Sequence, residues 1–439
     1  MSNPRQVALD LLLRVEETDS YINLLLSSVL EKSGLPEIDR GLVQELSYGA
    51  LRWQLQYDEF INLLTPGKVL SAKVRISLRL GLHQLFRMRV PAHAAIHETV
   101  EMVKRFERSA AGLVNAVLRN CDRAGFDSLL GQVTENKPAI EVMAITHSHP
   151  KWVVTALISA LELDGKGGEI EQLLIANNET PEINLAALPG SNAQQALLEL
   201  GLTPGEASPI SFIAHGNPEP LLATPGVRVQ DQGSQLVALA LLAVGDKSGS
   251  WLDMCSGPGG KSALLQAGIA EQGGLLDCLE PAPHRAELVR QALNPKLQAN
   301  VIVGYGQEAK QNSYDAILLD APCSGLGSVR RKPESRWRKA PEQLANLTKI
   351  QAELLEAAVL ALKPGGYLLY STCSPIVVET NTQVKLILDR HPELELENAN
   401  EVLNKINPEL KLPTGRKTAQ LWTHLHTTDA MFMALIRKK

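Results

Sequence analysis

The sequence predicts a multidomain protein with an all-α N-terminal part, a small α+β connector and a C-terminal α/β part built on a mostly parallel, doubly wound sheet. Up to about residue 145, apolar residues recur at the i, i+3, i+4 spacing of amphipathic helices. From about residue 235, short apolar strands alternate with helices, which is the pattern of a parallel sheet with crossover helices. The region between is rich in Pro, Gly, Ser and Asn. We therefore expect domains at 1–145, 146–234 and 235–439.

The elements follow from these periodicities. Helices of the first domain are expected at 7–15, 22–32, 39–53, 57–64, 74–88, 96–106 and 111–120. The connector is expected to have helices at 153–162 and 169–178 and a strand at 182–189. Strands of the third domain are expected at 251–255, 275–280, 301–305, 314–320, 365–373 and 431–438, with helices at 259–269, 284–293 and 344–362. Ligands of such sheets bind at the carboxyl ends of the strands, so the chemistry is expected there.

Composition excludes several classes of protein. The chain has 439 residues, of which 44% are hydrophobic and 21% charged, values typical of globular domains. No stretch reaches the roughly 18 apolar residues of a membrane span, and the first residues lack the features of a signal peptide. The five cysteines are scattered, without a CxxC or a Cys/His pair, so neither a disulfide scaffold nor a metal site is expected. We expect a cytoplasmic, soluble monomer.

The charge distribution confines any nucleic-acid surface to local patches. The formal net charge of −5 argues against a uniformly basic coat. Residues 1–67 carry 5 basic and 10 acidic side chains, whereas residues 68–123 carry 11 basic and 4 acidic ones. Arg75, Arg79 and Arg87 are candidates for an RNA-binding helix face. A solvated helix surface is the alternative.

A second basic run covers residues 330–339 and includes a tryptophan and a proline, so a loop is expected. Arginines clamp phosphates, and an aromatic ring can stack on an unpaired base. Arg330, Arg331, Arg336 and Trp337 are therefore candidates for binding single-stranded RNA, and a solvated loop is the alternative.

A glycine-rich turn between a strand and a helix predicts a ligand site. Asp253 ends the strand, and Cys255-Ser256-Gly257-Pro258-Gly259-Gly260-Lys261 follows it. The turn matches neither GxGxxG nor a P-loop. Glu280 ends the next expected strand, where a carboxylate can accept hydrogen bonds from ribose hydroxyls. The combination favours a nucleoside-binding site.

Two cysteines also follow strand ends, Cys323 after Asp320 and Cys373 after Thr372. Neighbouring strand ends can bring both into one crevice. A nucleophilic cysteine needs thiolate character, which a nearby cation supplies. Lys261 and the arginines after Cys323 are candidates for that cation.

The sequence resembles the S-adenosylmethionine-dependent RNA cytosine-C5 methyltransferases. The resemblance rests on the motifs at 253–261, Asp320-Ala321-Pro322-Cys323-Ser324-Gly325 and Thr372-Cys373-Ser374. Residues 39–52 and 112–119 look like the NusB-like helical domain of the Sun/RsmB group, and residues 229–235 look like its entry into the catalytic domain. The resemblance thus covers essentially the whole chain and implies a Rossmann-like methyltransferase domain.

The resemblance also implies residue roles. Cys373 would add to cytosine C6, Asp320 would hydrogen-bond the base and help to protonate N3, and Cys323 would assist elimination. S-adenosyl-L-methionine would be held by Cys255, Ser256, Gly257, Pro258, Gly259, Gly260, Lys261, Glu280, Tyr305 and Asp320. The chain departs from the family at Tyr305, where an acid that can receive the adenine amino group is usual; the tyrosine could stack on adenine or use its hydroxyl.

The implied substrate is an unpaired or flipped cytosine of 16S ribosomal RNA, conventionally numbered 967. Three alternatives stay open. The same chemistry could act on transfer RNA or another ribosomal site. The chain could be a non-catalytic RNA-binding or antitermination factor. DNA methylation is disfavoured, because Cys323 would then be the nucleophile and Cys373 would have no role.

Overall fold

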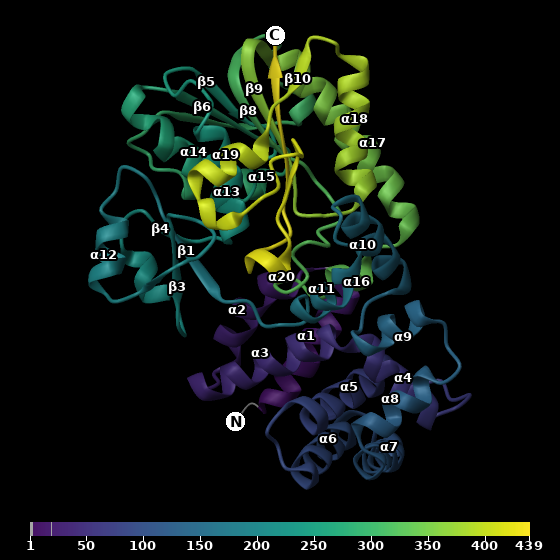
Figure 1. The fold of residues 1–439 in the computed structure, drawn as a ribbon. Helices are drawn as coiled ribbons and strands as arrows, with labels where there is room; N and C mark the ends of the chain where they lie inside the picture. Colours follow the sequence, from purple (N-terminus) through teal and green to yellow (C-terminus); the bar gives the residue numbers. More distant parts are fainter. Residues whose placement is uncertain (1–2, 19) are drawn as a thin grey trace. The chain divides into compact units, whose positions relative to one another are not determined.

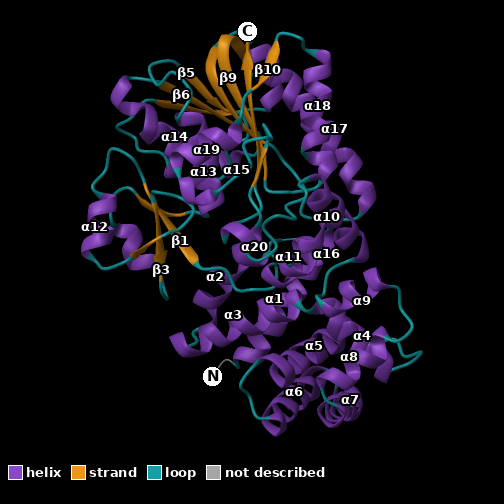
Figure 2. Cartoon of the chain, in the orientation of Figure 1, coloured by secondary structure: helices purple, strands orange, loops and turns teal. Residues whose placement is uncertain are grey.

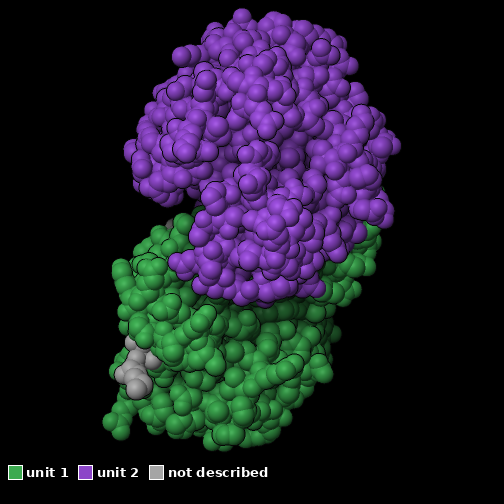
Figure 3. All heavy atoms as spheres, turned by 90° about the vertical axis from the view of Figure 1, so that its left-hand side faces the viewer, with its two compact units in different colours: residues 1–178, 329–338 green, residues 179–328, 339–439 purple. Residues whose placement is uncertain are grey.

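The computed structural model describes residues 3–18 and 20–439. The chain forms two compact units (Figure 3). The helical unit consists of residues 1–178 together with 329–338, and the sheet unit consists of residues 179–328 together with 339–439. This division differs from the expected boundaries at 145 and 234. The connector helices fold with the helical unit, whereas the connector strands fold with the large sheet.

The helical unit contains the seven helices expected up to residue 120, and its remaining helices complete a bundle (Figure 2). Apolar faces of these helices form two buried clusters, one around Leu9, Leu12 and Leu46 and the other around Phe60 and Leu82. The helices are α1 (Pro4–Thr18), α2 (Ile22–Ser33), α3 (Glu37–Arg52), α4 (Gln54–Leu64), α5 (Ala72–Arg87), α6 (Ala92–Phe106), α7 (Ala111–Ala124), α8 (Phe126–Thr134), α9 (Ala139–Thr146), α10 (Lys151–Leu163), α11 (Ile170–Ala176) and α16 (Ser335–Arg338).

The sheet unit begins with a small antiparallel sheet in the order β2-β3-β1-β4. Its strands are β1 (Ile183–Ala187), β2 (Thr203–Pro204), β3 (Ser211–Ala214) and β4 (Val227–Val229), and helix α12 (Ala193–Glu199) joins β1 to β2. Leu185, Leu197 and Phe212 form the core of this layer.

The large sheet has the order β10-β12-β9-β8-β5-β6-β7, with β11 paired to β12. Strands β5 to β9 run parallel to one another, and β12 runs antiparallel to β9. This is the mostly parallel, doubly wound sheet that the sequence predicts. The strands are β5 (Ser250–Asp253), β6 (Leu275–Glu280), β7 (Ala299–Val303), β8 (Tyr314–Asp320), β9 (Leu362–Thr372), β10 (Leu394–Leu396), β11 (Ala419–Gln420) and β12 (Phe432–Lys438).

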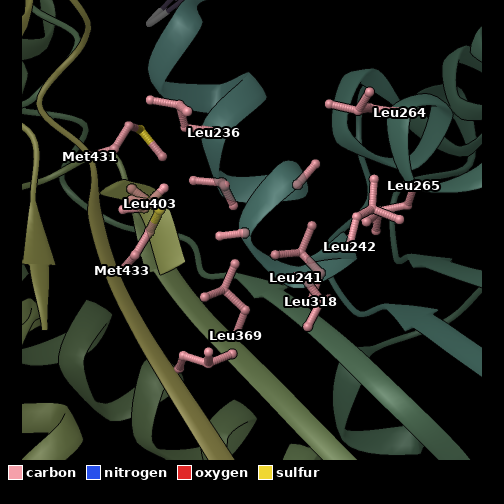
Figure 4. Close-up of a cluster of buried hydrophobic side chains, with 14 of the residues drawn as sticks. Leu236, Leu241, Leu242, Leu264, Leu265, Leu318, Leu369, Leu403, Met431 and Met433 are labelled. Carbon is pink, nitrogen blue, oxygen red and sulfur yellow. The ribbon is translucent and has the colours of Figure 1, made fainter. Parts of the chain in front are cut away.

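Helices cover both faces of this sheet (Figure 1). Side chains alternate between the faces along a strand, so Leu318 points into one buried cluster and its neighbours Ile317 and Leu319 into the other. Figure 4 shows the first cluster, which includes Leu241 and Leu369. The covering helices are α13 (Gln232–Leu242), α14 (Gly260–Ile269), α15 (Pro283–Ala292) and α19 (Ala399–Ile406) on one face, and α17 (Pro341–Ala361) and α18 (Asn381–Arg390) on the other.

Within the described residues, no helix is both long and apolar enough to cross a membrane.

Candidate active site

The two cysteines that follow strand ends lie side by side. Strands β8 and β9 are parallel neighbours in which Asp320 pairs with Ser371, so the loops that follow them leave the same edge of the sheet. The Sγ atoms of Cys323 and Cys373 are 3.4 Å apart, within hydrogen-bonding distance for thiols. Both side chains are partly exposed. The structure thus brings together the two cysteines singled out in the sequence.

The electrostatic surroundings of the two thiols differ. The hydrogen bond to Cys373, burial, and the negative charges of Glu379 and Asp320 hold the pKa of Cys323 well above its usual value. Cys323 therefore stays a thiol at neutral pH. The other cysteine lies in the field of a cation. Burial alone would lower the pKa of Lys261, but Asp320, Cys373 and Asp253 together raise it, so the ammonium persists beside Cys373.

An ion pair fixes the carboxylate at the end of β8. Nζ of Lys261, in the first turn of α14, lies 2.7 Å from Oδ2 of Asp320. Oγ of Ser371 donates to Oδ1 of Asp320 at 2.9 Å. Both carboxylate oxygens are held, and the side chain stays 28% exposed. Asp320 can therefore still offer lone pairs to a ligand.

The glycine-rich turn packs against the end of β6. The N–H of Gly257 donates to Oε2 of Glu280 at 3.2 Å, and Arg285 lies 3.5 Å from the same oxygen. A Cβ at Gly257 would lie 2.2 Å from Oε2 of Glu280, so a side chain there would push the turn and the acid apart. The free N–H groups at the start of α14, which begins at Gly260, can bind a carboxylate. The residues fit a ligand with a ribose and a carboxylate.

Asp253 and Cys255 are enclosed parts of this turn. Asp253 is 1% exposed and accepts a hydrogen bond from Oγ of Ser262 at 2.7 Å. Burial raises the pKa of Asp253 to about 6. Burial also raises the pKa of the Cys255 thiol, with the acids around it adding to the shift. Asp253 therefore braces the turn, and Cys255 contributes a small uncharged side chain.

Tyr305 follows strand β7 and is 62% exposed. Val303, two residues earlier, pairs with Glu280 on β6, so the tyrosine leaves the sheet beside the acid. Its backbone N–H donates to Oε2 of Glu308 at 3.0 Å. The exposed ring is available for stacking on a planar ligand.

The run 330–339, expected to be a loop, contains the short helix α16 (Ser335–Arg338), and three of its candidate RNA-binding residues are engaged within the protein, which corrects the expectation of a loop. Arg336 is 0% exposed and donates to the carbonyls of Ser148 and Asn177 and to Oδ1 of Asn178. Nε1 of Trp337 donates to the carbonyl of Leu51 at 2.7 Å. Arg330 is 6% exposed. Because the enclosed backbone carbonyls of the helical unit need donors, the buried guanidinium of Arg336 is engaged within the protein and is not available to a phosphate.

The candidates on α5 are also internal cross-links. Arg79 is 7% exposed and forms ion pairs with Asp58 and Glu16. Arg75 pairs with the same Asp58 at 3.3 Å. The guanidinium of Arg87 lies 3.3 Å from the ring centroid of Trp53 and donates to Gln56. These arginines hold helices together within the bundle, and the expected contact of this face with RNA stays a prediction. Arg331 remains partly exposed.

Glu379 and Ser371 also belong to this site, although no motif in the sequence marks them: Glu379 contacts the cysteine loops and Ser371 contacts Asp320. Glu379 is 0% exposed and accepts a hydrogen bond from the N–H of Ser324. An acidic residue outside any recognised motif cannot be assigned a functional role from the sequence. Only its position six residues after Cys373 could have drawn attention to it.

The fold and the site together define a methyltransferase domain joined to a helical domain, and comparisons with known proteins agree. Residues 239–437 match the family described as 16S rRNA methyltransferase RsmB/F, and residues 2–123 match the NusB family. The chain belongs to the RsmB/F family of 16S rRNA methyltransferases. Its cofactor is S-adenosyl-L-methionine.

Individual relatives span nearly the whole chain. A Mycobacterium tuberculosis (strain CDC 1551 / Oshkosh) protein, named as a methyltransferase without a stated substrate, is 38% identical over 99% of this chain and 96% of its own length. The "Probable ribosomal RNA small subunit methyltransferase B" of Bacillus subtilis (strain 168) is 32% identical over 99% of this chain and 98% of its own. The crystal structure of PH0851 has a TM-score of 0.75 at 20% identity, covering 100% of this chain and 99% of that one, which supports the fold.

Proposed function

We propose that the protein transfers a methyl group from S-adenosyl-L-methionine to C5 of a cytosine in 16S ribosomal RNA, conventionally position 967, through a covalent adduct with Cys373. The observation that carries this proposal is the pair of thiols 3.4 Å apart beside the Lys261–Asp320 ion pair. A cysteine held as a thiol beside a second cysteine that interacts with an ammonium suits a reaction that needs one nucleophile and one neutral hydrogen-bond donor next to it.

The residues fit successive steps of this reaction. The Cys373 thiolate forms a bond to cytosine C6 while N3 takes a proton from solvent, and Asp320 orients the base for this step. C5 of the resulting enamine then takes the methyl group, which the sulfonium cofactor supplies when bound. A water molecule takes the C5 proton, the Sγ–C6 bond breaks and N3 returns its proton to solvent, which restores the aromatic ring and the Cys373 thiolate. Cys323, held as a thiol beside Cys373, assists this elimination by donating a hydrogen bond to the departing Sγ atom.

The cofactor site in this proposal consists of residues 255–261, Glu280 and Tyr305, with Asp320 at its edge. The first-turn N–H groups of α14 would bind the carboxylate of the cofactor, and Glu280 would accept from its ribose. The exposed ring of Tyr305 would stack on the adenine.

We place the RNA contacts of the helical unit on α6, on α7 and on the short helix η1 (Arg108–Ala110) between them, in place of α5. The exposed basic residues there are Lys104, Arg105, Arg108, Arg119 and Arg123. A groove of about 360 Å³ between α6 and α7 is lined by His97, Asn115 and Arg119, among others. Because the C6 face of a paired base is hidden in a duplex, the target cytosine is expected to be unpaired or flipped out.

Transfer of a labelled methyl group to protein-free 16S RNA tests the proposal, with products mapped by bisulfite sequencing. Cys373→Ala is expected to abolish transfer, and Cys323→Ala is expected to leave a trapped protein–RNA adduct. Normal activity of Cys373→Ala would refute the assignment of the nucleophile. Label in transfer RNA but not in 16S RNA would refute 16S RNA as the substrate and would leave the proposed methylation chemistry standing.

A further inference from the structure

Glu379 is a fully buried carboxylate that joins the two cysteine loops. It ends the short helix η6 (Val377–Glu379) that follows the Cys373 loop. Oε1 accepts hydrogen bonds from the N–H of Ser324 at 2.7 Å and from Nε2 of Gln351 at 3.3 Å. Oε2 accepts from Oγ of Ser324 and from Oγ of Ser374, each at 2.6 Å. Four donors thus converge on one anion.

Each serine in this cluster directly follows a cysteine, Ser324 after Cys323 and Ser374 after Cys373. The two hydroxyls are 3.0 Å apart. Gln351 on α17 also donates to the carbonyl of Pro322, which precedes Cys323. The carboxylate therefore links the two loops through the residues next to the cysteines.

The Cys323 loop depends on Glu379 more than the Cys373 loop does. Ser324 offers Glu379 both its N–H and its hydroxyl, whereas Ser374 offers only its hydroxyl. The Cys373 loop has a further internal bond, from Oγ1 of Thr372 to the carbonyl of Ser374 at 2.9 Å. The negative charge of Glu379 also contributes to the raised pKa of Cys323.

We propose that Glu379 is a positioning residue that holds the Cys323 loop in place beside Cys373, so that the adduct can be released after methyl transfer. The part concerning release rests on the proposed function. The positioning of Cys323 does not, and it can be measured without RNA.

The first test is alkylation of the cysteines by iodoacetamide at pH 8, mapped by mass spectrometry on the full chain without RNA or cofactor. Glu379→Gln removes the charge at nearly constant volume and is expected to speed alkylation of Cys323 several-fold, because the thiol ionises more readily. Ser324→Ala leaves the charge in place but loosens the Cys323 loop, and it is expected to raise the alkylation rate of Cys323 less than Glu379→Gln does. Equal Cys323 rates in wild type and Glu379→Gln would overturn the proposal, whatever reaction the enzyme catalyses.

The second test follows methylation of 16S RNA by the same variants. Glu379→Gln is expected to lower kcat about 10- to 100-fold, which is the scale of a misplaced catalytic group, and to accumulate protein–RNA adduct during turnover. The affinity for S-adenosyl-L-methionine is expected to stay within about twofold. Loss of adduct and turnover in equal proportion would show general damage and refute the role in release. Wild type that makes neither adduct nor product would refute the proposed function instead and leave the alkylation result standing.

Asp277→Asn is a matched control. Asp277 is a buried carboxylate of the same sheet that accepts from Oη of Tyr314 and from Asn300. Tyr314 begins β8, at the opposite end from Asp320. The Asp277→Asn protein is expected to show wild-type Cys323 alkylation even if its melting temperature falls.

Discussion

Nζ of Lys261 lies 2.7 Å from Oδ2 of Asp320 and interacts electrostatically with Cys373, so a single ammonium faces both the proposed base-binding acid and the proposed nucleophile. The lysine comes from the glycine-rich turn, whereas the acid and the cysteine come from two other strand ends. The ion pair therefore links the proposed cofactor site to the proposed thiol chemistry.

Lys261→Met is expected to reduce methyl transfer by about 100-fold, because the Cys373 thiolate and the Asp320 carboxylate both lose their counter-ion. The rising limb of the pH–rate profile should move to higher pH, since ionisation of Cys373 becomes harder without the cation. Steady-state rates between pH 6 and 9 measure this shift. A profile that keeps its midpoint would show that Lys261 does not act on the nucleophile.

Asp253 should give the stability of the sheet unit a pH dependence. Its pKa in the folded protein is about 6, raised from 3.8 mainly by burial. The folded protein therefore holds this proton more tightly than the unfolded chain, and the stabilisation is present below about pH 4 and lost as the pH rises to about 6, by about 3 kcal/mol. Urea unfolding of Asp253→Asn between pH 4 and 7 should lack this decline. Parallel curves for wild type and variant would contradict it.

Arg336→Met is expected to destabilise the helical unit by about 3–5 kcal/mol, since it leaves several enclosed carbonyls without donors. RNA affinity per folded molecule should not change. Thermal unfolding and a filter-binding assay measure the two effects. Arg14, an exposed arginine of the same unit, is the control: Arg14→Ala should alter the melting temperature little. Weaker RNA binding by a fully folded Arg336→Met protein would restore a direct RNA role for this residue.

The proposed RNA surface on α6, η1 and α7 predicts a change in salt dependence. Replacing Arg105, Arg108 and Arg119 by Ala should lower the slope of log affinity against log salt by about 2 to 3, one unit for each lost phosphate contact. Arg79→Ala is the control, because its ion pairs are internal; it should lower the melting temperature and keep the slope. An unchanged slope in the triple variant would show that these residues make no phosphate contacts and only keep the surface soluble.

Tyr305→Ala is expected to weaken binding of S-adenosyl-L-methionine about 10-fold, within the range of a lost base–aromatic stack. Tyr305→Phe keeps the ring and should bind like the wild type. Isothermal titration of both variants separates stacking from a hydrogen bond of the hydroxyl: if Tyr305→Phe binds as weakly as Tyr305→Ala, the hydroxyl is the contact.

Strand ends were predictable from the sequence, whereas the burial of charged side chains was not. Apolar periodicity placed the strands that precede Cys323 and Cys373, and parallel topology then brings the two thiols to one edge. By contrast, Arg79 and Arg336 have the same helical or loop context as exposed arginines, and their partners Asp58 and Ser148 are distant in sequence. Such contacts depend on tertiary packing, which local pattern does not encode. The same holds for Glu379, whose donors come from three separate segments.

The segment 329–338 has a consequence for how the protein can be divided. A fragment beginning at residue 179 would carry Arg336 and Trp337 without the carbonyls of Leu51, Ser148 and Asn177 that accept their hydrogen bonds, and would present this stretch to water only a few residues beyond Cys323. A fragment ending at residue 178 would lack the side chains of Arg336 and Trp337 that donate these hydrogen bonds. The helical unit therefore cannot be exchanged between relatives as one continuous segment. Its exchange requires two separate stretches of the gene, so the two units are expected to be inherited together.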